Sequence, residues 1–123
     1  MPRKNPDGAG SAPVVVTKAY DFVKWLLPKV ENFPRAHKFT IGDRLTANGL
    51  DLLTALVEAA YSHRKDDLLQ AANRKVNSTR YLLRLAKDLK LLTTDAYGFS
   101  VEKLDEIGRM VGGWMKSLTP ERV

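Results

Sequence analysis

The sequence lacks cysteine altogether: none occurs among its 123 residues. Disulfide-stabilised domains, thiolate zinc sites and cysteine nucleophiles are therefore excluded. It also lacks any apolar run near the roughly 20 residues that a transmembrane helix needs. The N-terminal stretch MPRKNPDGAGSAP has no apolar segment of the kind found in signal peptides. Together these absences predict a cytoplasmic protein with no membrane partner.

Groups that could support catalysis are also scarce. The only histidines are His37 and His63. His63 lies near Asp66 and Asp67, but aspartates at the start of a helix are already explained by its positive N-terminal end. Neither histidine follows an arginine by four to six residues, the pairing of HEPN-type ribonucleases, and no phosphate-binding glycine loop is present. We therefore predict no catalytic residue, no metal, no cofactor and no enzyme activity.

What the sequence does contain is helical periodicity. Apolar residues recur at three- and four-residue spacing, and no stretch alternates like a strand. The spacing predicts four helices, from about Ser11 or Thr17 to Phe33, Thr40 to Ser62, Asp66 to Leu92 and Ser100 to Leu118. Four amphipathic helices joined by short loops predict an all-α, up-down-up-down four-helix bundle. We place it at residues 14–119, between a flexible N-terminal tail at 1–13 and a C-terminal tail at 120–123.

Local signals within these blocks carry further expectations. Pro28 must kink the first helix or begin a new turn, because it lacks an N–H and clashes with the preceding turn. Gly42 and Gly49 weaken the second helix by roughly 1 kcal/mol each relative to alanine, which is tolerable where a neighbouring helix comes close. Ser100 is expected to be the N-cap of the fourth helix.

The net charge of +6 is concentrated in one segment. Residues 64–92 hold eight basic and three acidic groups, and a basic zone of this kind suggests a polyanionic partner. Along the third helix, polar side chains form a continuous stripe. Only Asp88 interrupts the zone, so we expect acids to neutralise little of its positive charge. The alternative to a binding site is that the zone is an ordinary solvated helix face. The candidate binding residues, with Asn73 beside them, are Arg74, Lys75, Asn77, Arg80, Arg84, Lys87 and Lys90.

The aromatic residues permit two interpretations. Trp25, Tyr97, Phe99 and Trp114 could stack against nucleic-acid bases or could pack in the core. Core packing is favoured for Trp114, which lies on the apolar stripe of the fourth helix. Trp25 falls beside its stripe, so we expect it at an interface or a helix edge.

Three segments resemble a known family. They are WLLPKVENFPRAHKFTIGDRL at residues 25–45, RYLLRLAKDLKLL at 80–92 and LDEIGRMVGGWMKSL at 104–118. They are similar to the accessory variability determinant (Avd) proteins, which are encoded beside the reverse transcriptase of diversity-generating retroelements. The similarity covers roughly residues 17–118, and its most specific part is the Gly-Gly-Trp inside an amphipathic helix.

The resemblance implies more than the residues themselves show. It implies a protomer of a barrel-shaped homopentamer in a bacterial host cell, without enzyme activity. It also implies binding to the retroelement reverse transcriptase and to RNA or DNA in support of cDNA synthesis for mutagenic retrohoming. On this basis the basic zone of the third helix would contact the polymerase or its template RNA.

Other functions stay open at this stage. The wider superfamily includes proteins encoded in intervening sequences of large-subunit ribosomal RNA genes, so an rRNA-binding or ribosome-associated bundle is the second hypothesis. A third is an assembly factor that binds only proteins through the same basic face. A ribonuclease that uses His37 or His63 is the least favoured.

Overall fold

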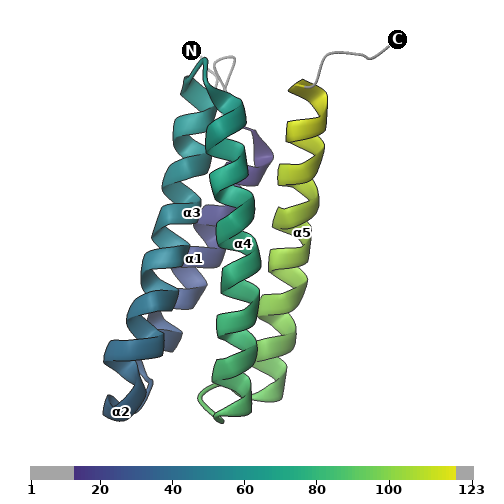
Figure 1. The fold of residues 1–123 in the computed structure, drawn as a ribbon. Helices are drawn as coiled ribbons and strands as arrows, with labels where there is room; N and C mark the ends of the chain where they lie inside the picture. The colour runs from purple at the N-terminus through teal and green to yellow at the C-terminus, as the bar shows by residue number, and fades with distance from the viewer. Residues whose placement is uncertain (1–12, 119–123) are drawn as a thin grey trace.

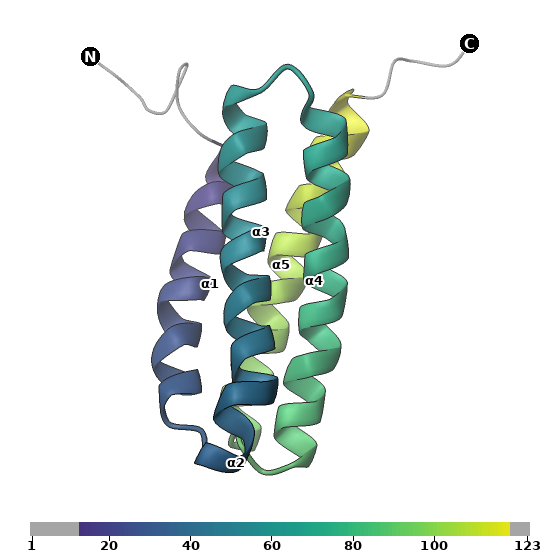
Figure 2. The same cartoon turned by 60° about the vertical axis from the view of Figure 1, so that its left-hand side comes forward.

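The computed structural model describes residues 13–118 and contains four long helices. They are α1 (Val14–Glu31), α3 (Asp43–Tyr61), α4 (Lys65–Asp88) and α5 (Thr94–Leu118). A short helix α2 (Arg35–His37) and a π-helical segment η1 (Lys38–Gly42) connect α1 to α3. Successive long helices run in opposite directions, with α2 and the α4–α5 turn at the same end (Figures 1 and 2). This confirms the prediction of an all-α four-helix bundle. The predicted tails, Pro13 apart, lie outside the described residues.

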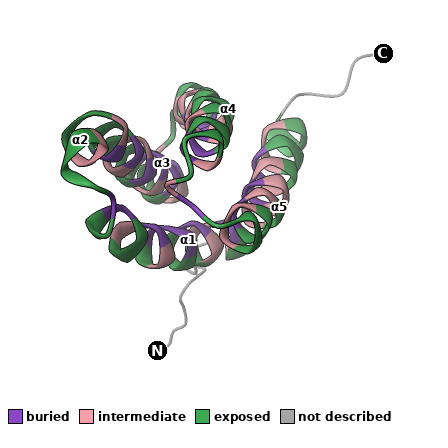
Figure 3. Cartoon of the chain, turned by 90° about the horizontal axis from the view of Figure 1, so that it is seen from below, coloured by how far each residue is buried: buried purple, intermediate pink, exposed green. Residues whose placement is uncertain are grey.

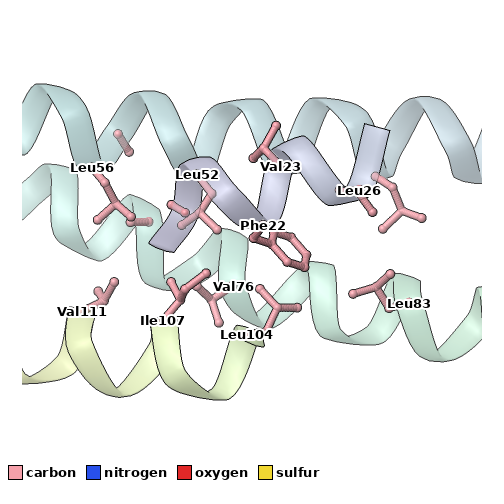
Figure 4. Close-up of a cluster of buried hydrophobic side chains, with 14 of the residues drawn as sticks. Phe22, Val23, Leu26, Leu52, Leu56, Val76, Leu83, Leu104, Ile107 and Val111 are labelled. Atoms are coloured by element: carbon pink, nitrogen blue, oxygen red, sulfur yellow. The ribbon is translucent and has the colours of Figure 1, made fainter. Parts of the chain in front are cut away.

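Each long helix contributes one apolar stripe to the core. The buried residues face the middle of the bundle in the end-on view (Figure 3), and Figure 4 shows Phe22 and Leu26 of α1 among leucines and valines of the other helices. Burial of such side chains is the main favourable term in folding, at about 1.5–3 kcal/mol each. The stripe residues, at 0–6 % exposure, are Val15, Ala19, Phe22, Val23, Leu26, Val30, Leu45, Leu52, Leu56, Ala59, Leu69, Ala72, Val76, Leu83, Ala86, Leu104, Ile107 and Val111.

The two glycines of the second predicted block lie where helices approach closely, as expected. A Cβ at Gly49 would lie 3.1 Å from Cδ2 of Leu26 on α1. One at Gly42 would lie 2.9 Å from Cγ1 of Val30. Glycine is a poor helix former, but at these two positions the missing side chain leaves room for α1 to pack against η1 and α3.

The last helix begins earlier than the sequence suggested. It starts at Thr94, and the side-chain oxygen of Thr93 accepts a hydrogen bond from the Ala96 N–H at 3.0 Å. Thr93 is thus the N-cap. The expectation that Ser100 fills this role was wrong: Ser100 is buried inside α5, and its hydroxyl donates to the carbonyl oxygen of Tyr97 at 2.7 Å. A threonine seven residues upstream makes the cap that Ser100 would have made.

Pro28 does not begin a new element. It lies inside the last turn of α1, which continues to Glu31. The turn that follows is closed by the N–H of Phe33, which donates to the carbonyl of Val30 at 3.0 Å, and Pro34 precedes α2. Pro28 lacks the N–H that would bond to the carbonyl of Lys24, so the end of α1 has one intrahelical hydrogen bond fewer.

Candidate nucleic-acid interface on helix α4

Six of the seven candidate residues lie on α4 and the seventh in the turn after it. The buried stripe of α4 points into the core, so the remaining circumference carries the polar side chains. We call the seven residues the basic surface of α4; they are Arg74, Lys75, Asn77, Arg80, Arg84, Lys87 and Lys90. The seven residues fall into two groups: cations that pair with an acidic side chain, and residues that do not.

Three of these cations are paired. Lys75 Nζ lies 3.3 Å from Oδ2 of Asp51 on α3. Arg80 forms an ion pair with Asp105 on α5, and both side chains are partly exposed, at 36 % and 43 %. Lys87 Nζ lies 3.7 Å from Oδ1 of Asp88 and 5.1 Å from the centroid of the Tyr97 ring. The expectation of weak neutralisation was therefore wrong, because the packing of α3 and α5 brings acids to α4 that are far away in the sequence.

The other cations are available to a partner. Arg74, Arg84 and Lys90 are exposed, as is Asn77 beside them. Across residues 13–118 no ion pair involves these three cations. Guanidinium groups in this state can donate bidentate hydrogen bonds to phosphate oxygens or carboxylates, and an exposed lysine can contribute a point charge. These residues are therefore the part of the basic surface best placed to bind a polyanion.

Lys90 is held in an unusual backbone conformation. Its φ is 64°, the left-handed region, where glycine is the usual residue. Its N–H donates to the carbonyl of Lys87 at 2.9 Å, and the N–H of Leu91 donates to the carbonyl of Ala86 at 2.8 Å. This pair of bonds is a Schellman motif that ends α4. A lysine in this position costs roughly 1–2 kcal/mol of backbone strain, so the chain keeps a charge where glycine would be more stable.

An apolar ridge runs beside the basic surface, and the sequence analysis missed it. Tyr81 and Leu85 on α4 and Leu89, its C-cap residue, recur every four residues and are exposed, Tyr81 by 72 %. Neighbouring α3 exposes a second apolar set, Leu50, Val57 and Tyr61. The signal was present in the sequence as a second apolar spacing on each helix, but it was obscured by the stronger stripe of core residues. Exposed apolar residues gathered on two adjacent helices are typical of a protein–protein contact surface.

The aromatic residues named as possible stacking platforms are largely used inside the protomer. The Trp25 ring lies 6.1 Å from that of Phe22 and 5.0 Å from that of Phe99, centroid to centroid, which ties α1 to α5. Trp114 is half-buried and packs against the core, as expected. Tyr97 lies under the Lys87 ammonium, as noted above.

Other kinds of site find little support in the described part of the chain. Between residues 13 and 118, no three His, Asp or Glu side chains are grouped so that they could hold a metal ion. His63 is exposed at the α3–α4 turn, and Asp67 there pairs with Arg64 at 3.3 Å. No helix in the described range combines the length and the apolar character that crossing a membrane requires.

A four-helix bundle with exposed cations along one helix and exposed apolar residues beside them belongs to the class of small all-α bundle proteins. Within that class the family can be stated. A family model described as bAvd-like matches residues 13–118, and the chain belongs to this family. This confirms the resemblance to bacterial Avd proteins of diversity-generating retroelements.

Solved structures extend the comparison at the level of the fold. The chain is similar to the crystal structure of a protein of unknown function from the S23 ribosomal protein family of Bacteroides thetaiotaomicron. The two are 20 % identical, with a TM-score of 0.78 over 84 % of this chain and 96 % of that one. At this identity the match shows a shared fold and nothing more. The comparison with curated proteins finds no match.

Proposed function

We propose that this protein is a non-catalytic accessory subunit of a diversity-generating retroelement. It binds the element's reverse transcriptase and its template RNA or cDNA through the basic surface of α4, and so supports the cDNA synthesis of mutagenic retrohoming. Membership of the bAvd-like family supports the association with a retroelement. The observation that carries the binding role is the group of exposed, unpaired cations, Arg74, Arg84 and Lys90.

The proposed mechanism is electrostatic tethering. Each phosphate that a lysine or arginine neutralises releases counterions, so binding draws on solvent entropy and weakens as salt rises. A subunit that holds polymerase and template together raises their local concentration without any chemical step of its own. Arg74, Arg84 and Lys90 would make direct contacts, whereas Lys75, Arg80 and Lys87 already have acidic neighbours and would contribute mainly to the long-range field.

The active form is proposed to be a homopentamer. Leu50, Val57 and Tyr61 on α3 and Tyr81 and Leu85 on α4 expose apolar area that a second copy could cover. Five chains of charge +6 would carry about +30 in one assembly, which would attract RNA or DNA strongly at low salt.

The test is co-purification with the reverse transcriptase encoded beside this gene, followed by light scattering for mass. A stable complex, and a free protein with the mass of five chains, would support the proposal. Recovery of ribosomal RNA with no binding to the polymerase would instead favour the rRNA-associated alternative. Binding to proteins with no measurable affinity for RNA or DNA would favour a pure assembly factor.

A further inference from the structure

Phe39 is an exposed aromatic side chain that neither the core nor the basic surface of α4 explains. It is 59 % exposed and lies on η1, the π-helical segment between α2 and α3. π-Helical segments are rare and frequently mark functional sites. The segment lies at the end of the bundle where α2 and the α4–α5 turn are found (Figure 2). A single exposed phenylalanine proves nothing by itself, so its surroundings decide what it could bind.

Two cations lie at this ring. Cζ of Arg35 is 6.0 Å and Nζ of Lys38 is 5.9 Å from the centroid of Phe39. Both distances are at the outer limit of a cation–π contact, so the ring is flanked by positive charge but not covered by it. Lys38 also pairs with Glu31 at 3.4 Å, whereas no ion pair in the described chain involves Arg35.

A depression opens beside the ring. It is open to solvent and measures about 460 Å³. Ile41 and, from α4, Leu82 give it apolar walls, while Arg44 and Asp43 supply one charge of each sign. An acid inside the depression disfavours a phosphate there and can accept a hydrogen bond from the edge of a base. Arg44 and the cations at the ring are suited to the phosphates on either side.

We infer that Phe39 is a stacking site for an unpaired base of a single-stranded nucleic acid, with Arg35, Lys38 and Arg44 contacting the adjoining backbone. The inference rests on the proposed nucleic-acid binding and adds a second contact, at the end of the bundle. A flat apolar face bordered by cations suits a base attached to phosphates. An apolar peptide would cover the ring but leave the three cations against an uncharged chain, so the charges favour nucleic acid.

The test compares Phe39→Leu with Phe39→Trp in the full-length protein. Leucine keeps an apolar side chain but removes the flat ring, and tryptophan keeps a ring that can stack. Binding is measured by fluorescence anisotropy with an unstructured 20-nucleotide RNA and with a fully paired duplex of the same length. Phe39→Leu should weaken single-strand binding by about 5- to 150-fold, the range for one stacked base. It should leave duplex binding and the salt dependence unchanged, and Phe39→Trp should bind like the wild type.

The outcomes separate this inference from the proposed function. Unchanged single-strand affinity in Phe39→Leu overturns the stacking site; if Arg74→Ala/Arg84→Ala still weakens binding, the proposed function stands. A wild-type protein without affinity for either nucleic acid overturns both. An equal loss for single strand and duplex, or a change in mass by light scattering or in helix content by circular dichroism, also overturns the stacking site. Such a result would show that Phe39 holds a protein contact or the fold.

Discussion

Lys90 offers a prediction in which stability and binding change in opposite directions. We expect Lys90→Gly to stabilise the protein and, by removing one exposed cation, to weaken binding to RNA. The reason for the stabilisation is the φ of 64° at this position. Glycine has no Cβ to clash with the backbone in the left-handed region, whereas every other residue is strained there.

The magnitude follows from two opposing terms. Relief of the left-handed strain contributes roughly 1–2 kcal/mol to the free energy of unfolding. The greater freedom of glycine in the unfolded chain takes back about 0.4–1 kcal/mol. The net gain is about 1 kcal/mol, or about 4 °C in Tm for a domain of this size. Both hydrogen bonds of the Schellman motif involve backbone atoms of residues 86, 87, 90 and 91, so the substitution leaves them intact.

Lys90→Ala is the matched control, because it removes the same charge but keeps the strain. Thermal unfolding followed by circular dichroism, at one fixed protein concentration, should show a rise in Tm for Lys90→Gly and no rise for Lys90→Ala. Both variants should lose RNA affinity to the same extent. Equal Tm values for the two variants would refute the reasoning, since the left-handed backbone would then carry no cost.

Three further substitutions are expected to have measurable effects, and a fourth, Gly49→Ala, is the control for one of them. Thr79→Val should raise Tm by about 4 °C, because the buried Thr79 hydroxyl has no hydrogen-bond partner within residues 13–118, a loss worth about 1 kcal/mol. A fall in Tm would mean that the hydroxyl has a partner. Gly112→Ala should raise the free energy of unfolding by about 1 kcal/mol, since a Cβ there meets open space. Gly49→Ala, whose Cβ would press on a leucine of α1, should give no such gain, and equal gains would contradict the packing of α1 on α3. Asp105→Asn should free Arg80 and tighten RNA binding at a cost of under about 1 kcal/mol in stability; weaker binding would show that the ion pair helps to shape the interface.

The bundle was predictable because apolar residues that recur at helical spacing lie on the one face of each helix that is buried in the core. The spacing of Phe22, Leu52, Val76 and Ile107 within their own helices was sufficient to place each in the core, without knowledge of the partner helix. The glycine at position 49 was likewise consistent with a close helix contact before the identity of that neighbour was known. These features depend on local sequence and on the existence of a core, not on the details of the packing.

The interface was less predictable because it depends on contacts between helices. Asp51 and Asp105 neutralise Lys75 and Arg80, and neither acid is close to its partner in the sequence. A charge count along one segment therefore overstated how much of the basic surface is free. The predicted helices left residues 34–39 unassigned, where the structure has α2 and the start of η1. Phe39, the exposed residue that η1 carries, was therefore not singled out from the sequence.

The most direct test of the central claim compares two triple variants that remove the same charge. Arg74→Ala/Arg84→Ala/Lys90→Ala removes the unpaired cations, and Lys75→Ala/Arg80→Ala/Lys87→Ala removes the paired ones. Binding of an unstructured RNA is measured across a range of salt concentrations. Loss of three phosphate contacts should make the slope of log K against log salt less steep by about 2 in the first variant. The second variant should change it much less; equal slopes in both variants and the wild type would contradict binding through the basic surface of α4.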